Sequence, residues 1–474
     1  MLRYTIGLEV HIKLSTEHKM FCRCLNSQDF DTIKPNSHIC PICTAQPWAL
    51  PIINPEAITT AIRLWTIFWS TLHKDFSWDR KSYFYPDSPV WFQITQYHQP
   101  IIQWGHVQFF TDHFQTPHDI HIHEAHLEND TAKTITINDT TFIDFNRSWG
   151  PLIEIVTKPE FHSDEQVIEF LKELQRIIKL NHIWYADLEK GQMRVDVNIS
   201  VANEWSSHLG TRVEIKNLNS FASIRKAIAY EYERHTQCIT NNQPLDQETR
   251  RRDDQTGTTI TMRSKEQAMD YRYVPEHDLP MIDPNTISWK PSEHIITWYD
   301  KIQQLKAYWF HKEYIYWLLN SDLLFEWFQE WIDHGLDPKL IAKWLMGPVT
   351  TFINVYWESA IKLDSKWFIT FLDKLNTYGT PEAIAKPLFE TLIHGNTTID
   401  KSIDQFTIHQ ERSINVADVI TTVLENNPWV VSEYLGGKTT TIGFLLGQVM
   451  KATWWALNPQ ELKTTIEQMI TQMK

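Results

Sequence analysis

The chain has 474 residues, 42% of them hydrophobic and 22% charged, and this balance excludes wholesale disorder, a collagen-like chain and a disulfide-stabilised miniprotein. Its net charge of −14 excludes nucleic-acid binding by bulk electrostatic attraction, so such a partner would need a local basic patch or a basic partner protein. No apolar segment is long enough to cross a membrane, and the first residues do not resemble a signal peptide. We therefore expect a cytoplasmic protein with no membrane partner.

Up to about residue 294 the pattern is mixed. Alternating polar and apolar residues predict strands in 5–13, 121–130, 191–200 and 211–217. Helical spacing predicts three helices that begin after cap residues: 55 to about 72 after Asn54, 167–180 after Ser163 with Gln166 as its capping-box partner, and 221–235 after Ser220.

The rest of the chain has helical spacing and divides at the polar stretch HGNTTIDKSIDQ (394–405). The predicted fold class is α+β. We expect an antiparallel-sheet domain in 1–294, an all-helical domain in 295–404 and a small helical tail in 405–474. From Gln410 onward the tail carries six acidic and five basic residues, so it is the part of the chain that repels a polyanion least.

Four of the five cysteines fall within a short segment, at about residues 20–45. Cys22 and Cys24 form a C-x-C pair, and Cys40 and Cys43 form a C-x2-C pair after a gap of 15 residues. Two close thiolate pairs suit a tetrahedral structural zinc ion, with no open position for chemistry. Disulfides and unrelated reduced cysteines are the alternatives, and we expect Cys238 to be packed in a helix.

The predicted strands carry ionisable side chains at every second position, so that each set shares one face. The sets are Glu9 and His11; His126, Glu128 and Asp130; Arg194, Asp196 and Asn198; and Arg212, Glu214 and Lys216. One interpretation is the solvated face of an antiparallel sheet. The other is a metal-assisted phosphate site, since acids with a His suit a divalent cation and Arg or Lys suit a phosphate. Common nucleotide-binding motifs are absent, because GGKT at 436–439 lacks the earlier glycine of a P-loop.

The chain resembles the GatB family, the B subunits of aspartyl/glutamyl-tRNA amidotransferases, over essentially its whole length. The matching stretches are IGLEVH (6–11), CPIC (40–43), DRKSYFYPDSP (79–89), QITQYHQP (93–100), HLEND (126–130), DFNRSWGPLIEIVTKPE (144–160), LEKGQMRVDVNIS (188–200), GTRVEIKNLNSF (210–221), QETRRRD (247–253), MRSKE (262–266), DYRYVPEHDLP (270–280) and GFLLGQVMKAT (443–453). The resemblance implies a catalytic cradle domain on an antiparallel sheet, a helical domain and a small helical tail that contacts tRNA.

The resemblance also implies a reaction, the ATP-dependent phosphorylation of the side-chain carboxylate of Glu mischarged on tRNA(Gln) or Asp on tRNA(Asn). Ammonia from a partner, the glutaminase A subunit of the complex, then displaces the phosphate, and a small C subunit is the third component. ATP, Mg2+ and a structural Zn2+ are the implied cofactors. Which mischarged tRNA is physiological does not follow from the sequence.

Matching the motifs residue by residue implies roles for the polar side chains. Glu9, His11 and Glu128 resemble the metal ligands, and Asp196 and Asn198 resemble a further carboxylate–amide pair. The nucleotide and acceptor pocket would include Arg80, Lys81 and Tyr83, with Arg194, Arg212 and Lys216 as phosphate clamps or simple ion pairs. Asn129 stands where the family often has a second acid. If that acid is a metal ligand in the family, Asp130 or a water molecule would take its place in this chain. A non-catalytic tRNA-binding scaffold is the alternative function.

The tryptophan count is unusual, with 21 Trp against only 14 Gly. Several Trp stand where the family pattern or turn geometry favours Gly, namely Trp48, Trp91, Trp104 in a hairpin-like break, Trp149, and Trp454 with Trp455. Trp344 instead fits a helix core. Either the protein is divergent and rich in Trp, or its source reads UGA as Gly and these positions are Gly in the natural protein. The second interpretation predicts exposed or strained Trp at turns.

Overall fold

The computed structural model describes residues 2–26, 32–181, 183, 186–253, 255–264, 271–287, 297–356, 365–377, 388–389, 416–452 and 459–472. They form two compact units, Met1–Ala307 and Tyr308–Lys474. The first unit thus extends beyond the predicted boundary at residue 294, and the predicted linker at 394–405 lies outside the described residues. No helix of the described part is long and apolar enough to cross a membrane.

A nine-stranded sheet forms the centre of the first unit, in the order β13-β12-β11-β10-β1-β9-β6-β5-β2. Its strands are β1 (Leu2–Lys13), β2 (Thr71–Leu72), β5 (Ile102–Thr111), β6 (Thr116–Asn129), β9 (Pro151–Thr157), β10 (Met193–Asn203), β11 (Val213–Leu218), β12 (Glu248–Asp253) and β13 (Thr258–Ser264). The four predicted strands correspond to β1, β6, β10 and β11. The expectation of a purely antiparallel sheet was wrong at one place, because β11 and β12 pair in parallel. Their connection runs through a helix, and such a crossover permits parallel pairing.

Two smaller sheets complete the strands. One has the order β14-β3-β4, from β3 (Asp79–Ser82), β4 (Phe92–Thr95) and β14 (Val274–Pro275), and the other is a hairpin of β7 (Lys133–Ile137) and β8 (Thr140–Asp144).

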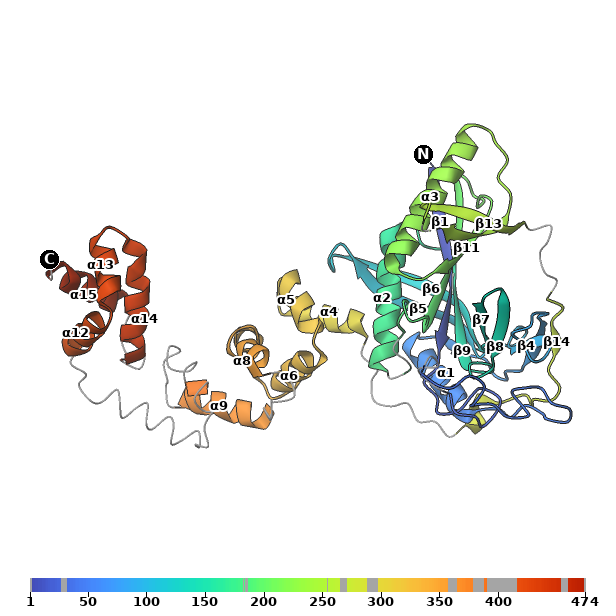
Figure 1. Cartoon of the computed structure of the whole chain (residues 1–474), viewed down its shortest axis with the longest axis horizontal. Helices are drawn as coiled ribbons and strands as arrows, with labels where there is room; N and C mark the ends of the chain where they lie inside the picture. The colour runs from blue at the N-terminus through green and yellow to red at the C-terminus, as the bar shows by residue number, and fades with distance from the viewer. Residues whose placement is uncertain are drawn as a thin grey trace. The chain divides into compact units, whose positions relative to one another are not determined.

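Helices cover one face of the large sheet (Figure 1). The first unit contains α1 (Pro55–Ile67), α2 (Asp164–Leu180), α3 (Phe221–Thr240), the 3-10 turn η2 (Pro284–Thr286) and α4 (Trp298–Ala307). Alternate residues of β1, such as Leu8 and Val10, are buried in the same core as Phe170 of α2 and Ile224 of α3. The residues between them on the strand, Glu9 among them, face the other way, so the open face of the sheet carries the ionisable side chains.

The predicted caps are confirmed. The side chains of Asn54, Ser163 and Ser220 accept hydrogen bonds from backbone N–H groups in the first turns of α1, α2 and α3. Helix α1 ends at Ile67 rather than near residue 72, because Trp69 adopts a positive φ and the chain then enters β2.

The second unit is helical in its described part. It contains α5 (Lys312–Leu319), α6 (Asp322–Asp333), α7 (Pro338–Trp344), the π-helical turn η3 (Leu345–Val349), α8 (Thr350–Tyr356), α9 (Ser365–Thr377), α12 (Val416–Asn426), α13 (Pro428–Leu435), the 3-10 turn η5 (Thr439–Thr441), α14 (Ile442–Ala452) and α15 (Pro459–Gln472). Trp344 is buried against Phe368 and Phe371, as its helical spacing predicts. Helices α12 to α15 share a separate small core that includes Ile420, Leu445 and Ile466.

Among the residues that the structure describes, five tryptophans adopt the left-handed backbone region that favours glycine: Trp48 (φ 69°), Trp69 (48°), Trp104 (51°), Trp149 (65°) and Trp309 (62°). Three of them were predicted, whereas Trp91 does not have a positive φ, and Trp454 and Trp455 lie outside the described residues. The predicted hairpin-like break at Trp104 was wrong, since this residue lies within β5. Trp48 is 98% and Trp309 90% exposed. A bulky side chain that gains no burial from a strained backbone favours Gly as the natural residue at these positions.

Candidate functional site

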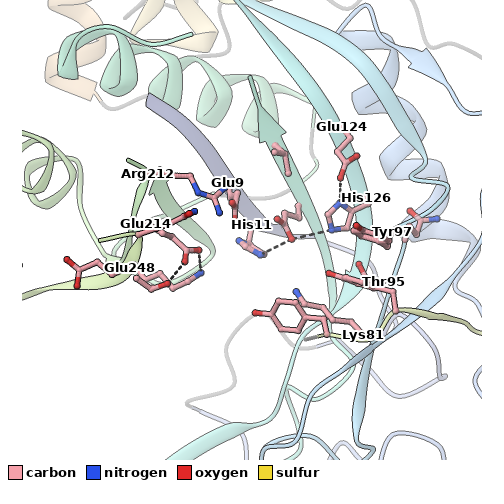
Figure 2. Close-up of a pocket in the computed structure, with 18 residues that line it drawn as sticks. Glu9, His11, Lys81, Thr95, Tyr97, Glu124, His126, Arg212, Glu214 and Glu248 are labelled. Atoms are coloured by element: carbon pink, nitrogen blue, oxygen red, sulfur yellow. Dashed lines mark hydrogen bonds and ion pairs between the residues drawn. The ribbon is translucent and has the colours of Figure 1, made fainter. Parts of the chain in front are cut away.

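Strand register brings the ionisable side chains of five strands onto the open face of the sheet. Across β1 and β10, Glu9 lies opposite Asp196 and His11 opposite Arg194. On the other side of β1, His11 lies opposite Glu154 of β9, which in turn lies opposite His126 of β6. Because directly opposite residues share a face, these groups converge. Figure 2 shows Glu9, His11 and His126 of this set on that face.

Among the described residues of this face, two groups could hold a cation. His11, Glu128 and Glu154 form the first, with one donor atom from each within 4.8 Å of the others. His11 Nε2 lies 3.2 Å from Glu154 Oε2 and 3.6 Å from Glu128 Oε1, and His126 Nε2 also lies 3.2 Å from Glu154 Oε2. Burial opposes the charge on His11, but Glu154 and Glu128 outweigh it and raise its pKa to about 9. At neutral pH a protonated His11 therefore pairs with both carboxylates.

Glu9, Asp196 and Glu214 form the second group. Lys216 Nζ lies 2.5 Å from Asp196 Oδ2 and 2.8 Å from Glu214 Oε1, and these two acids raise the pKa of Lys216 against the effect of burial. Asn198 donates from Nδ2 to Glu9 Oε1 over 2.9 Å. Burial first, then Glu154 and Glu214, raise the pKa of Glu9. By donor-atom distance Glu9 groups with Asp196 and Glu214, and His11 and Glu128 group with Glu154. The ligand set of Glu9, His11 and Glu128 stays a prediction.

Two recesses over this face share His11, Lys81 and Lys216 in their walls, with volumes of about 390 and 310 Å3. Tyrosine side chains line the larger recess. Tyr97 and Tyr273 stack with ring centroids 3.9 Å apart, and Lys81 Nζ lies 4.7 Å from the ring centroid of Tyr271. The site is therefore an open, polar depression with room for more than one anionic group.

The remaining predicted pocket residues divide between the recesses and their surroundings. Arg212 lies at the larger recess, and Arg194 and Tyr83 line the smaller one. Arg80 lines neither recess, since its guanidinium binds Glu276 at 2.7 Å on the adjacent small sheet. Adjacent residues of a strand point to opposite faces, which is why the structure separates Arg80 from Lys81.

Asn129 and Asp130 do not add a ligand to either group. The Asn129 side chain is buried and accepts a hydrogen bond from the backbone N–H of Ile94. Asp130 follows the end of β6, and its Oδ1 lies 3.2 Å from Arg194 while its Oδ2 lies 3.5 Å from Arg147. Burial opposes its ionisation, but the two arginines outweigh this and lower the pKa of Asp130. The third donor beside His11 and Glu128 comes from Glu154, not from Asp130.

Sequence reasoning missed Glu154 as a site residue, and it left His126 and Glu214 without a role. Glu154 is the one charged residue of the strand Pro151–Thr157, which is otherwise apolar apart from its last residue. A single acid in a buried strand must be paired, so this signal was available before the structure.

The four clustered cysteines are brought together as their spacing predicts. Their four Sγ atoms all lie within 4.8 Å of one another. Cys43 Sγ lies 4.0 Å from Cys24 Sγ and 3.8 Å from Cys40 Sγ, and all four are free thiols in this structure. A hydrogen bond from Cys22 and the nearby Lys19 ammonium outweigh burial and lower the pKa of Cys43 to about 5. We call this cluster, Cys22 to Cys43, the cysteine knuckle. Cys238 is half-buried on α3, apart from it.

Comparison with known proteins identifies two family regions. Residues 4–288 match the model of the GatB/GatE catalytic domain, and residues 326–470 match that of the GatB domain. The B subunit of the aspartyl/glutamyl-tRNA(Asn/Gln) amidotransferase of Clostridium botulinum strain Hall is 34% identical over 481 aligned positions, covering 99% of both chains. The protein of the same name from strain Eklund 17B is 34% identical over 463 positions, covering 96% of both.

Proposed function

Because the chain belongs to the family of GatB amidotransferase subunits, we propose that the open face of its sheet activates a carboxylate for amidation at the expense of ATP. The substrate would be the side-chain carboxylate of Glu on tRNA(Gln), of Asp on tRNA(Asn), or of both. One observation carries the proposal: two groups of cation-binding side chains lie beside Lys81, Arg194 and Lys216 in adjoining recesses. Such an arrangement can hold two anions, a carboxylate and a triphosphate, next to one another.

The proposed reaction has two steps. A carboxylate oxygen attacks the γ-phosphorus of ATP, the bond from this phosphorus to the bridging oxygen breaks, and ADP leaves. Ammonia then attacks the acyl carbon, the carbon–oxygen bond breaks with loss of inorganic phosphate, and a proton leaves the nitrogen to give the amide. The ammonia would come from the glutaminase A subunit of a complex that also contains the small C subunit.

The donor sets fit Mg2+, which would neutralise phosphate charge when bound. His11, Glu128 and Glu154 would hold one ion, since they supply two carboxylates and an imidazole within 4.8 Å. Glu9, Asp196 and Glu214 offer a second place, where the amide of Asn198 orients Glu9.

The cations of the recess walls would act on the phosphates and the acceptor. Lys81 lies on β3, Arg194 on β10, and Arg212 and Lys216 at or on β11, so these cations can approach a triphosphate from several sides. Tyr83 would border the acceptor pocket, while Arg80 would hold β14 beside β3 through its bond to Glu276.

The cysteine knuckle would hold a structural Zn2+, because four sulfur donors leave no coordination position for a substrate. The tail, residues 405–474, would contact tRNA. A complex in which this chain ends before residue 405 should bind ATP normally and tRNA more weakly, and unchanged tRNA affinity and salt dependence would assign the tail another role.

The complex reconstituted with its glutaminase and its small third component tests the main proposal. ATP hydrolysis should require a mischarged tRNA, and hydroxylamine in place of ammonia should yield a tRNA-bound hydroxamate. Amidation that proceeds without ATP, or without a species that hydroxylamine can trap, would contradict the two-step scheme. A complex with His11→Ala that keeps full ATP-dependent amidation would instead favour the non-catalytic scaffold.

A further inference from the structure

Lys19 is completely buried next to the cysteine knuckle. Its ammonium lies 3.1 Å from the carbonyl oxygen of Phe145 and 3.7 Å from Cys43 Sγ. Among the described residues, no carboxylate forms an ion pair with it. Lysine is almost never fully buried without a partner of opposite charge, because the loss of hydration costs several kcal/mol. The contacts of Lys19 therefore call for a negative charge at the position of the sulfur atoms.

The possible chemical states of the cysteine knuckle differ in charge. Four neutral thiols or two disulfides carry none, and would leave the ammonium with a single carbonyl. One thiolate at Cys43 beside three thiols carries −1. Four thiolates around a divalent cation carry a net charge of −2, and one ammonium offsets half of it. Of these states, the metal-bound one places the most negative charge beside Lys19.

We propose that Lys19 is the built-in counter-charge of a metal tetrathiolate at Cys22, Cys24, Cys40 and Cys43, and that it strengthens metal binding through an N–H···S hydrogen bond to Cys43. The inference rests on the proposed structural zinc. Partners that hydrogen-bond to metal ligands commonly change metal affinity by about 10- to 100-fold. Lys19 acts through the cysteines and is a positioning residue, not a ligand.

The same ammonium ties the cysteine knuckle to the segment that leads to the recess. Lys19 donates to the carbonyl of Phe145, and the backbone N–H of Met20 donates to the carbonyl of Trp149. Trp149 N–H in turn donates to the carbonyl of Asp130, whose carboxylate holds Arg194. Hydrogen bonds thus join the segment of Lys19 and Met20 to residues next to a wall of the smaller recess.

The test compares full-length protein with Lys19→Met, which keeps the shape of the side chain and removes its charge, and with Lys34→Met as a control. Lys34 is exposed in the same segment. In competition with a chromophoric chelator, Lys19→Met should bind zinc about 10- to 100-fold more weakly than the wild type, and Lys34→Met should not. With Co2+ in place of zinc, the thiolate-to-metal charge-transfer bands of Lys19→Met should shift.

Thermal unfolding adds a dependence on the metal that a purely structural lysine would not give. With zinc, Lys19→Met should have a lower Tm than the wild type. In the reduced, metal-free protein the decrease in Tm should be clearly smaller, because at most the single thiolate of Cys43 then faces the buried ammonium. A Tm lowered equally in both states would overturn the proposal.

Further outcomes distinguish the zinc site itself from the role of Lys19. A wild-type protein that binds no zinc refutes the proposed zinc site itself. A wild type that binds zinc beside a Lys19→Met variant with affinity within twofold and an unchanged Co2+ spectrum refutes the role of Lys19 alone. If Lys19→Met does not fold, Lys19→Gln keeps a donor for Phe145 without the charge. It should show the same loss of zinc affinity, and unchanged affinity would refute the proposal.

Discussion

The open face of the sheet and the cysteine knuckle both gather cation-binding side chains, but they do so in different ways. On the sheet, oxygen donors and a His come from neighbouring strands in register and border recesses of about 390 and 310 Å3. In the cysteine knuckle, four sulfurs come from two turns and face one another, with a buried lysine behind them. Donors that leave space suit a cation that meets a substrate, whereas donors that close around an ion suit a cation that holds the chain together.

The two regions also balance their charge differently. The acids of the sheet face are interleaved with Lys81, Arg194, Lys216 and two His, so substrate anions can replace protein carboxylates as partners of these cations. In the cysteine knuckle, Lys19 is buried, so no substrate anion can replace the sulfur atoms as its partner. The comparison therefore predicts that damage to the sheet face lowers turnover, and that damage to the cysteine knuckle lowers stability.

The largest expected effect is on turnover. His11→Ala or Glu128→Ala should lower amidation by the complex by at least about 1,000-fold, since loss of a ligand to a catalytic cation costs several kcal/mol of transition-state stabilisation. Affinity for tRNA should stay near that of the wild type. His121→Ala is the control. This half-exposed His lies on β6, the strand of Glu128, but it pairs with Glu160 away from the recesses. Near-normal turnover of either variant at saturating Mg2+ would contradict a catalytic role for the open face of the sheet.

Cys40→Ser should act on stability instead. Loss of one thiolate should lower the free energy of unfolding by at least about 3 kcal/mol, while the folded fraction keeps most of its turnover. The measurement is thermal unfolding together with turnover per folded molecule, and Cys238→Ser serves as a control outside the cysteine knuckle. Less than half an equivalent of zinc in freshly purified protein would contradict the premise.

Glu173 sharpens the comparison, because it is a buried acid that belongs to neither region. Burial, only partly offset by Arg176, raises its pKa to about 7. A carboxyl whose pKa is higher in the folded state contributes stability that is fully present below its unfolded pKa, near 4.5, and is lost as the pH rises through 7. The loss between pH 4.5 and 8 should reach at most about 3 kcal/mol. Glu173→Gln should remove this part of the pH dependence in urea unfolding, and Glu169→Gln on the same helix should not.

The smallest expected effects concern the strained tryptophans. Replacement of Trp48, Trp104 or Trp309 by Gly should each stabilise the chain by about 1 kcal/mol, because the left-handed backbone then costs no steric strain. Trp344→Gly should instead destabilise it by about 3–5 kcal/mol through loss of a core side chain. Peptide mass spectrometry of the natural protein offers a direct check, and Trp found at residue 149 would refute Gly as the natural residue there.

Much of the fold follows from local signals in the sequence. The caps Asn54, Ser163 and Ser220 are residues whose side chains satisfy free N–H groups, so they mark the helix starts without tertiary information. The strands show period-two alternation. The parallel pairing of β11 and β12 could not be predicted in this way, because it depends on how the intervening helix returns the chain.

The site could be predicted only as sets of residues on separate strands. Alternation tells which residues of one strand share a face, but the register between strands decides which residues of two strands meet. For this reason the sequence alone groups Glu9 with His11, although the structure places it with Asp196 and Glu214. Arg80 shows the reverse case, in which adjacent positions in one motif point to opposite sides of a strand.

The parallel pairing of β11 and β12 has a consequence for local unfolding. Helix α3 forms the connection between these strands, and its buried Glu231 binds Arg250 of β12 at 3.1 Å. On the sheet side, Thr249 Oγ1 donates to Glu214 Oε2 over 2.7 Å. Strands near the edge of a sheet usually exchange their amide hydrogens early by fraying. Here β12 is bound both to helix α3, through Glu231, and to an acid of the recess, Glu214. Its amide hydrogens should therefore exchange together with those of α3, in one cooperative opening.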